Sequence, residues 1–169
     1  MALTPGNDSH EKRMLTLWIL WAAMLGSLFA YVFICHRMGD RTSPLGPDFP
    51  LALLRNILMG IAAVTLILTR FIRRLMLAER TGDAPPAAPG ALPASIDPAV
   101  YARYTTAMLV ALAFSESIGI YGVVLFFLGD SFHTLYIFTG ISAAAMLFYR
   151  PKNQEIEALA RKATRPGPY

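Results

Sequence analysis

An acidic residue, Glu116, lies near the middle of a long apolar stretch, residues 102–128. With 27 residues, this stretch is long enough to cross a bilayer core about 30 Å thick with some tilt. An ionised side chain at that depth costs on the order of 3 kcal/mol on insertion scales, so intramembrane acids usually have a partner or a role in ion or proton exchange. The residue type and its position therefore predict an intramembrane carboxyl that binds a proton or a cation.

Three polar residues near Glu116 in the sequence, Ser115, Ser117 and Tyr121, are predicted to belong to the same ion- or proton-binding site. Burial penalises the charged form of a carboxyl, so the group is expected to carry its proton much of the time and to exchange it on meeting water or a cation. A second interpretation is equally open. The neutral acid would then hydrogen-bond a neighbouring helix and hold two helices together, with Arg55 as one candidate partner inside the chain.

Small residues surround the acid on its predicted helix. Ala111, Ser115 and Gly119 follow one another at intervals of four, the small-xxx-small spacing that lets helix backbones approach closely in lipid. The residues predicted to serve helix packing are Ala111, Ala113, Gly119 and Gly122.

The run Glu116-Ser-Ile-Gly-Ile-Tyr-Gly-Val-Val, with Ala-Leu-Ala at 111–113 before it, resembles the ion-carrying helix of the rotary ATPase proteolipids, the c or K subunits. The resemblance is confined to this third apolar segment. It implies that Glu116 is the ion-binding carboxylate and that Tyr121 and Gly122 are the matching residues of the same helix.

The composition indicates a membrane protein. Of the 169 residues 55% are hydrophobic and only 15% are charged, which is too apolar for an ordinary soluble domain. Four apolar segments (14–35, 51–69, 102–128 and 132–149) predict an all-α integral membrane four-helix bundle made of two antiparallel hairpins. The single cysteine, Cys35, excludes an intramolecular disulfide.

The segments divide the chain into five predicted parts. These are a polar cytoplasmic tail (1–13), a first membrane hairpin with a basic amphipathic extension (14–80), a Pro/Ala-rich cytoplasmic linker (81–98), a second hairpin (99–150) and a cytoplasmic tail (151–169).

A weak internal match relates the two hairpins. At an offset of 90, Ser27 and Tyr31 fall on Ser117 and Tyr121, which suggests a parallel tandem repeat, with a chance match of apolar helices as the alternative. The position that matches Glu116 is Gly26, so only the second hairpin has the acid.

The basic residues are unevenly distributed. Twelve of the 15 Lys and Arg residues lie in the amino-terminal tail, in residues 70–103 or after residue 149, which predicts that both termini are cytoplasmic in a multi-pass protein of the plasma (inner) membrane. Arg70, Arg73 and Arg74 follow the second apolar segment and are predicted to lie against anionic lipid headgroups.

Motifs of other function classes are missing. The sequence has no phosphate-binding Gly-rich loop, nucleophile elbow, HExxH or CxxC, and its arginines do not form a nucleic-acid-binding pattern. We therefore predict neither an enzyme nor a cofactor, metal or nucleic-acid site; a metal or quinone-head site built from His36, His133, Asp40 and Asp130 is a minor alternative. The expected partners are the bilayer, anionic headgroups, and other membrane subunits or copies of the chain. The leading function is proton or cation binding at Glu116 within an oligomer or larger complex; the rival is a non-catalytic accessory or structural subunit.

Overall fold

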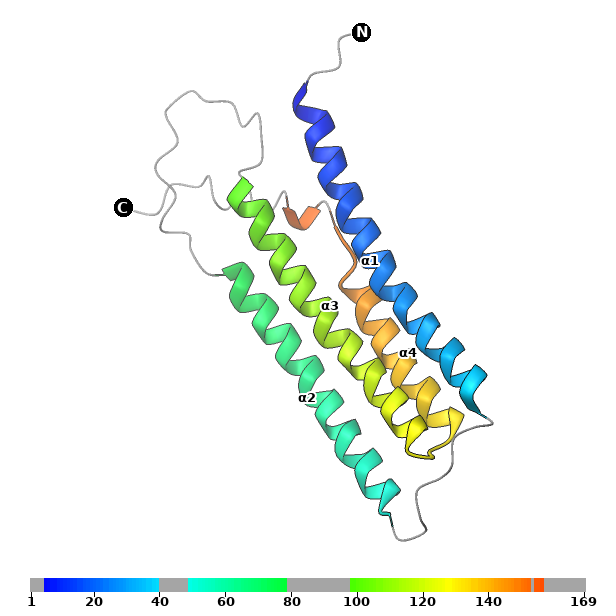
Figure 1. The fold of residues 1–169 in the computed structure, drawn as a ribbon. Coiled ribbons are helices and arrows are strands. Elements are labelled where there is room, and N and C mark those ends of the chain that lie inside the picture. Colours follow the sequence, from blue (N-terminus) through cyan, green and yellow to red (C-terminus); the bar gives the residue numbers. More distant parts are fainter. Residues whose placement is uncertain (1–4, 40–48, 79–97, 153, 157–169) are drawn as a thin grey trace.

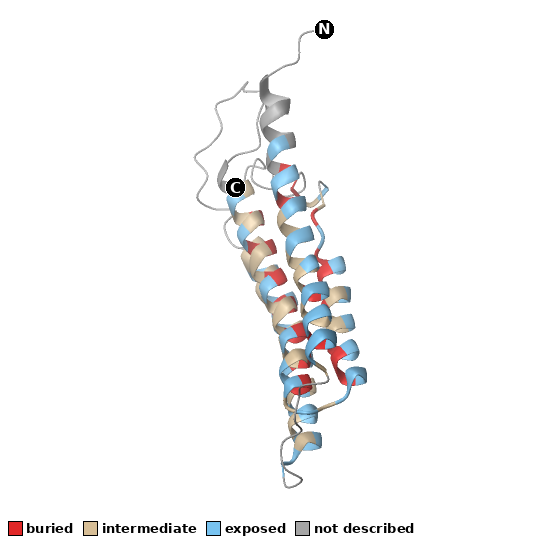
Figure 2. Ribbon diagram, turned by 45° about the vertical axis from the view of Figure 1, so that its right-hand side comes forward, coloured by how far each residue is buried: buried red, intermediate tan, exposed pale blue. Residues whose placement is uncertain are grey.

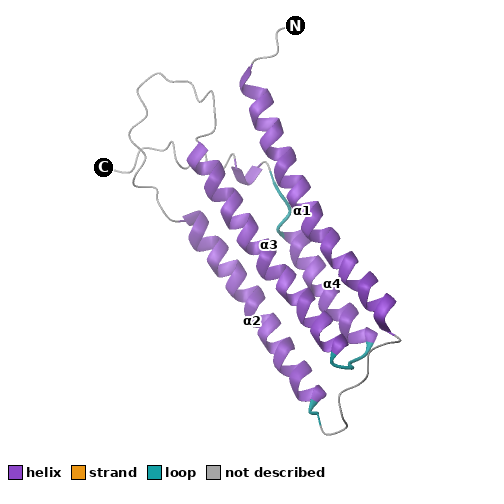
Figure 3. Cartoon of the chain, in the orientation of Figure 1, coloured by secondary structure: helices purple, strands orange, loops and turns teal. Residues whose placement is uncertain are grey.

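A computed structural model of the chain describes residues 5–39, 49–78, 98–152 and 154–156. Within these residues the protein is all-helical and contains no strand, as the sequence predicted (Figure 3). The main helices are α1 (Pro5–Met38), α2 (Leu51–Ala78), α3 (Pro98–Phe127) and α4 (Phe132–Phe148).

Three of these helices contain an apolar stretch long enough to cross a membrane: Met14–Met38, Leu51–Leu77 and Tyr101–Phe127. The fourth helix, α4, is also apolar but has 17 residues. Many large apolar side chains of the described helices point outward, as the lipid-facing residues of a membrane protein do; Phe29 and Ile67, for example, are 73% and 71% exposed. Length, composition and this outer surface together indicate a multi-pass membrane protein.

The third helix is the centre of the arrangement. It packs against α4, α2 and α1, whereas α1 and α2 lie on opposite sides of it (Figure 1). Burial agrees, because 44% of the core of the α3 apolar stretch is buried, against 11% for α1 and for α2. Figure 2 shows the buried residues gathered on the facing sides of the helices and the exposed residues outside.

Glycines permit the tight contacts of α3. A Cβ at Gly122 would come within 2.8 Å of the Phe138 Cβ on α4, and one at Gly119 within 2.6 Å of Leu28 Cδ2 on α1. Gly129 sits in the turn between α3 and α4 with a φ of 98°, a conformation that glycine adopts without strain. These positions bring α4 back along α3 at close range.

The helix limits differ from the predicted ones at several places. The first helix begins at Pro5 rather than at residue 14, and proline is favoured in the first turn of a helix. The second helix continues to Ala78, as the amphipathic extension suggested, and α3 begins at Pro98. Residues 1–4, most of the linker (81–97) and most of the carboxyl-terminal tail (157–169) lie outside the described residues, as does Asp40.

Candidate functional site

The Glu116 carboxyl of α3 is partly buried and faces α1. Its Oε1 atom accepts a hydrogen bond from the Tyr31 hydroxyl at 3.0 Å and lies 2.5 Å from Ser27 Oγ. Ser27 and Tyr31 are four residues apart and therefore lie on the same face of α1. The three side chains form a polar cluster near the middle of two helices that are long enough to span a membrane; it is called the Glu116 cluster below.

The hydroxyl groups of this cluster can form hydrogen bonds with both the ionised and the protonated form of the carboxyl. Ser27 Oγ also lies 2.7 Å from the Met24 carbonyl oxygen, and a serine hydroxyl has one hydrogen to donate and lone pairs to accept with. When Glu116 is ionised, Ser27 donates to Oε1. When Glu116 is protonated, its acid hydrogen goes to Ser27 Oγ, and Ser27 donates to the Met24 carbonyl. The same atomic positions thus satisfy either protonation state.

The polar residues predicted to join Glu116 lie elsewhere on α3. Ser115 and Ser117 donate to backbone carbonyl oxygens of their own helix, those of Ala111 (2.8 Å) and Phe114 (2.7 Å). Tyr121 packs beside an apolar cluster that α2, α3 and α4 form. The hydroxyl partners of the acid come from α1 instead.

Sequence reasoning did not assign Ser27 and Tyr31 to the site, although a signal was present. They are the two residues that align with Ser117 and Tyr121 in the internal match of the hairpins. A hydrogen bond between helices needs a donor on the facing helix, and the first hairpin supplies such donors in Ser27 and Tyr31.

The alternative partner of Glu116, Arg55, pairs with a different acid. Arg55 Nη1 lies 3.8 Å from Asp130 Oδ1, in the turn after α3. Within the described residues Glu116 has no ion-pair partner, so its contacts are with neutral hydroxyls and not with a cation.

Three of the four predicted packing residues are at helix contacts. Ala111, Gly119 and Gly122 are buried, whereas Ala113 is exposed, in contrast to the prediction. Gly119 faces Leu28 of α1 and Gly122 faces Phe138 of α4. The side of α3 that carries Glu116 and Gly119 is therefore the one that α1 covers.

Two further hydrogen bonds join the helices around the cluster. Ser142 of α4 donates to the Ser115 carbonyl oxygen at 2.6 Å, and Trp21 Nε1 of α1 donates to the Met146 carbonyl oxygen at 2.9 Å. Both acceptors are backbone groups within helices. Together with the Glu116 cluster they fix α1 and α4 against α3.

The residues of the minor alternative, a metal or quinone-head site, lie at the end of the bundle that holds the turn between α3 and α4, except for Asp40, which is outside the described residues. The His36 Nε2 atom lies 3.0 Å from the Tyr136 hydroxyl, and its ring packs against Phe132. Among the described residues, no three His, Cys, Asp or Glu side chains are placed to hold a metal ion.

The predicted headgroup arginines gather at one end of the bundle. Arg70, Arg73 and Arg74 line a cavity of about 190 Å³ at the end of α2, together with Leu77, Phe148 and Tyr149.

Comparison with protein-family models, with curated proteins and with solved structures finds no match to this chain. The fold and the site define a class, an all-helical multi-pass membrane protein with a hydrogen-bonded acid between two of its helices.

Proposed function

We propose that this chain is a plasma-membrane protein in which Glu116 binds and releases a proton, acting within an oligomer or a larger membrane complex. The observation that carries the proposal is the Glu116 cluster, whose Ser27 hydroxyl complements the carboxyl in both its ionised and its protonated form. An acid that only joined two helices would stay protonated and would need only the hydrogen bonds of the protonated form.

A proton suits the cluster better than a metal cation. A hard divalent cation binds about six oxygen atoms, which the protein or water supplies. The cluster offers the carboxylate, two hydroxyls and the Met24 carbonyl, and the hydroxyls already lie within hydrogen-bond distance of Oε1. A proton needs no further ligands. The resemblance to proteolipid helices supports the same role for Glu116, with α1 of the same chain supplying the facing hydroxyls.

The proposed arrangement in the membrane follows the charge distribution and the helices. We place both termini in the cytoplasm and α4 as a fourth span, so that two antiparallel hairpins, related as a tandem repeat, form the bundle. Four helices give little room for a water-filled path. We therefore place the proton's access route at a contact with other subunits or copies of the chain.

The second candidate is an accessory subunit in which Glu116 only joins helices. The observation in its favour is that both hydrogen bonds of the acid run from α1 to α3. In this case the carboxyl would stay neutral, and its loss would weaken the assembly and nothing else.

An infrared pH titration of the full chain in liposomes separates the two. A proton-binding Glu116 gives a carboxylic-acid carbonyl band that disappears as the pH is raised and that is missing in Glu116→Gln. A band that persists at every pH at which the protein stays folded would leave only the helix-joining role.

Chemical labelling provides an independent measurement. A hydrophobic carbodiimide reacts with protonated carboxyls, so we expect slow modification of Glu116 that falls as the pH rises. Glu116→Gln keeps the shape and the neutral hydrogen bonds and serves as the unlabelled control. Glu116→Leu, which removes the hydrogen bonds as well, reports any loss of assembly.

A further inference from the structure

The cavity at the end of α2 combines basic and apolar walls. Arg70, Arg73 and Arg74 line it from one helix, and Leu77, Phe148 and Tyr149 supply apolar and aromatic surface. The arginines are at positions i, i+3 and i+4 and therefore share one face of α2. This cavity is independent of the Glu116 cluster.

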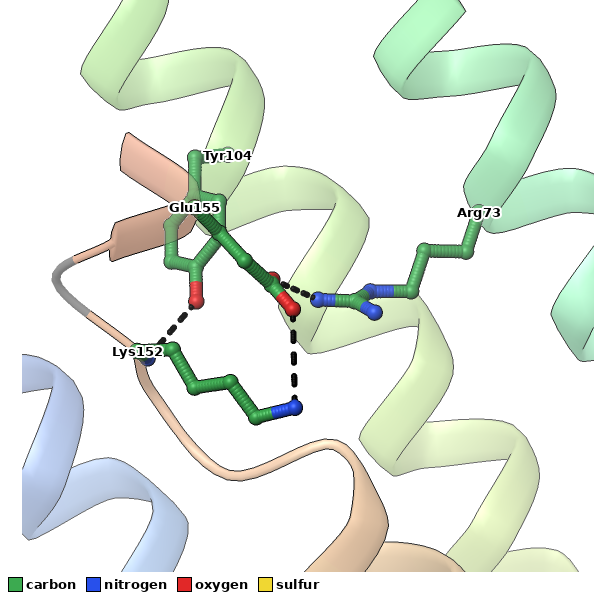
Figure 4. A network of polar contacts seen from close by, with 4 residues as sticks. All are labelled: Arg73, Tyr104, Lys152 and Glu155. Atoms are coloured by element: carbon green, nitrogen blue, oxygen red, sulfur yellow. Dashed lines mark hydrogen bonds and ion pairs between the residues drawn. The ribbon is translucent and has the colours of Figure 1, made fainter. Parts of the chain in front are cut away.

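One of the three arginines already has an acidic partner. Arg73 Nη2 lies 2.5 Å from Glu155 Oε2 and its guanidinium lies 5.3 Å from the centre of the Tyr149 ring. Lys152 Nζ approaches the other Glu155 oxygen at 3.7 Å, and the Lys152 backbone N–H donates to the Tyr104 hydroxyl (Figure 4). The carboxyl group of Glu155 is thus shared between two cations, those of Arg73 and Lys152.

The other two arginines have no such partner among the residues that the structure describes. Arg70 and Arg74 are exposed, and within the described residues neither lies within ion-pair distance of a carboxylate. Arg70 lies 6.0 Å from the centre of the Phe148 ring. Two guanidinium groups at one cavity, four residues apart, present several N–H donors in the planar geometry that matches phosphate oxygens.

The position of the cavity indicates whether a phospholipid or a free ion would supply a bound phosphate group. It lies at the end of the apolar stretch Leu51–Leu77, where a spanning helix leaves the hydrocarbon region. Tyr149, which is of a residue type enriched at membrane interfaces, and Phe148 form part of its wall. A free phosphate ion would use the arginines alone, whereas a phospholipid would use the arginines for its headgroup and the apolar wall for its glycerol and upper chain.

We propose that this cavity is a binding site for the phosphate headgroup of an anionic glycerophospholipid, held by Arg70 and Arg74, with Arg73 kept in place by Glu155. This lipid site is separate from the proposed proton site, so an experiment can refute either proposal and leave the other unaffected.

Native mass spectrometry of the full chain, released from nanodiscs of mixed phosphatidylcholine and phosphatidylglycerol, tests the proposal. The wild type is expected to retain phosphatidylglycerol preferentially. Loss of one arginine–headgroup contact of about 1 kcal/mol lowers the affinity about fivefold, so the double variant Arg70→Gln/Arg74→Gln should lower this preference about twenty-five-fold.

The matched control is Arg37→Gln. Arg37 is also exposed and also lies over an aromatic ring, 5.2 Å from the centre of Phe33, but it belongs to the opposite end of the bundle. This variant should keep the preference. An equal loss in both variants, or no preference in the wild type, would overturn the site, because either result reduces it to general attraction between basic residues and an anionic surface.

Competition with inorganic phosphate distinguishes a phospholipid headgroup from a free phosphate ion as the ligand of this cavity. Excess phosphate should not displace phosphatidylglycerol from the wild type. Efficient displacement, together with phosphate adducts that Arg70→Gln/Arg74→Gln removes, would show a site for free phosphate and refute the lipid. An unfolding curve of each variant in detergent verifies that the compared proteins are folded.

Discussion

The change Tyr31→Phe tests whether Glu116 ionises, because it removes one hydroxyl donor and leaves the ring in place. Tyr31 donates to Glu116 Oε1 at 3.0 Å, so its loss should destabilise the contact between α1 and α3. The size of the effect depends on the charge of the acceptor. We therefore expect the cost of Tyr31→Phe to change with pH.

The magnitudes follow from the two forms of the acid. Hydrogen bonds between neutral groups on membrane helices contribute about 0.6 kcal/mol on average, which is the expected cost at acidic pH. A hydrogen bond to a charged group contributes about 1.5–3 kcal/mol, which is the expected cost once Glu116 has lost its proton. The sign is fixed by the donor: Tyr31 stabilises the carboxylate more than the acid, so its removal costs more as the pH rises.

The free energy of unfolding of the full chain in mixed micelles, measured with increasing sodium dodecyl sulfate at a series of pH values, reports this cost. Two variants serve as controls. In a Glu116→Gln background the cost of Tyr31→Phe should stay near the acidic-pH value at every pH. Tyr121→Phe removes a hydroxyl from α3 at a residue that packs beside the apolar cluster, and it should show no pH-dependent cost.

A cost of Tyr31→Phe that is the same at every pH, and the same in the Glu116→Gln background, would refute the reasoning. The carboxyl would then keep one charge state throughout, and the proposed proton exchange would have no basis in this cluster.

Three further outcomes are expected from the helix contacts and the carboxyl-terminal segment. Gly122→Ala places a methyl group 2.8 Å from the Phe138 Cβ and should destabilise the protein by about 1–3 kcal/mol, while Gly140→Ala, where nothing lies within 4 Å, should be neutral or stabilising in the same unfolding assay. Ser142→Ala removes the hydrogen bond between α4 and the backbone of α3 and should cost about 0.6 kcal/mol; no change in stability would show that this bond contributes nothing. Glu155→Gln weakens the pair with Arg73 at a cost of roughly 1 kcal/mol. The backbone amides of residues 154–156 should therefore exchange hydrogen about fivefold faster. Unchanged exchange would mean that the apolar contacts of Ile156 hold this segment alone.

The all-helical fold could be predicted because apolar length is a property of each segment by itself. A run such as 102–128 has to form hydrogen bonds internally in a membrane, which leaves the helix as its structure. The ends were harder to predict. Residues 6–9 (Gly-Asn-Asp-Ser) have low helix propensity, so the sequence does not show that the helix of the apolar segment continues backward through them.

The acid itself was also evident from the sequence, because a charged residue in an apolar run stands out in one dimension. Its partners were indicated only by the weak internal match of the two hairpins, because their contact depends on how α1 is rotated about its axis. The apolar residues of α1 surround the helix on all sides, so its sequence does not indicate a preferred face. The nearest hydroxyls in the chain, those of Ser115 and Ser117, turn back to their own helix, as serines in apolar helices commonly do.

The central position of α3 has a consequence for the order in which the protein is made. The first two helices leave the ribosome before the helix that packs between them, and they lie on opposite sides of it in the finished structure. Until α3 is inserted, α1 carries the hydroxyls of Ser27 and Tyr31 in the bilayer without the acid they contact. A chain interrupted before α3 would therefore leave α1 and α2 without the helix that both of them contact.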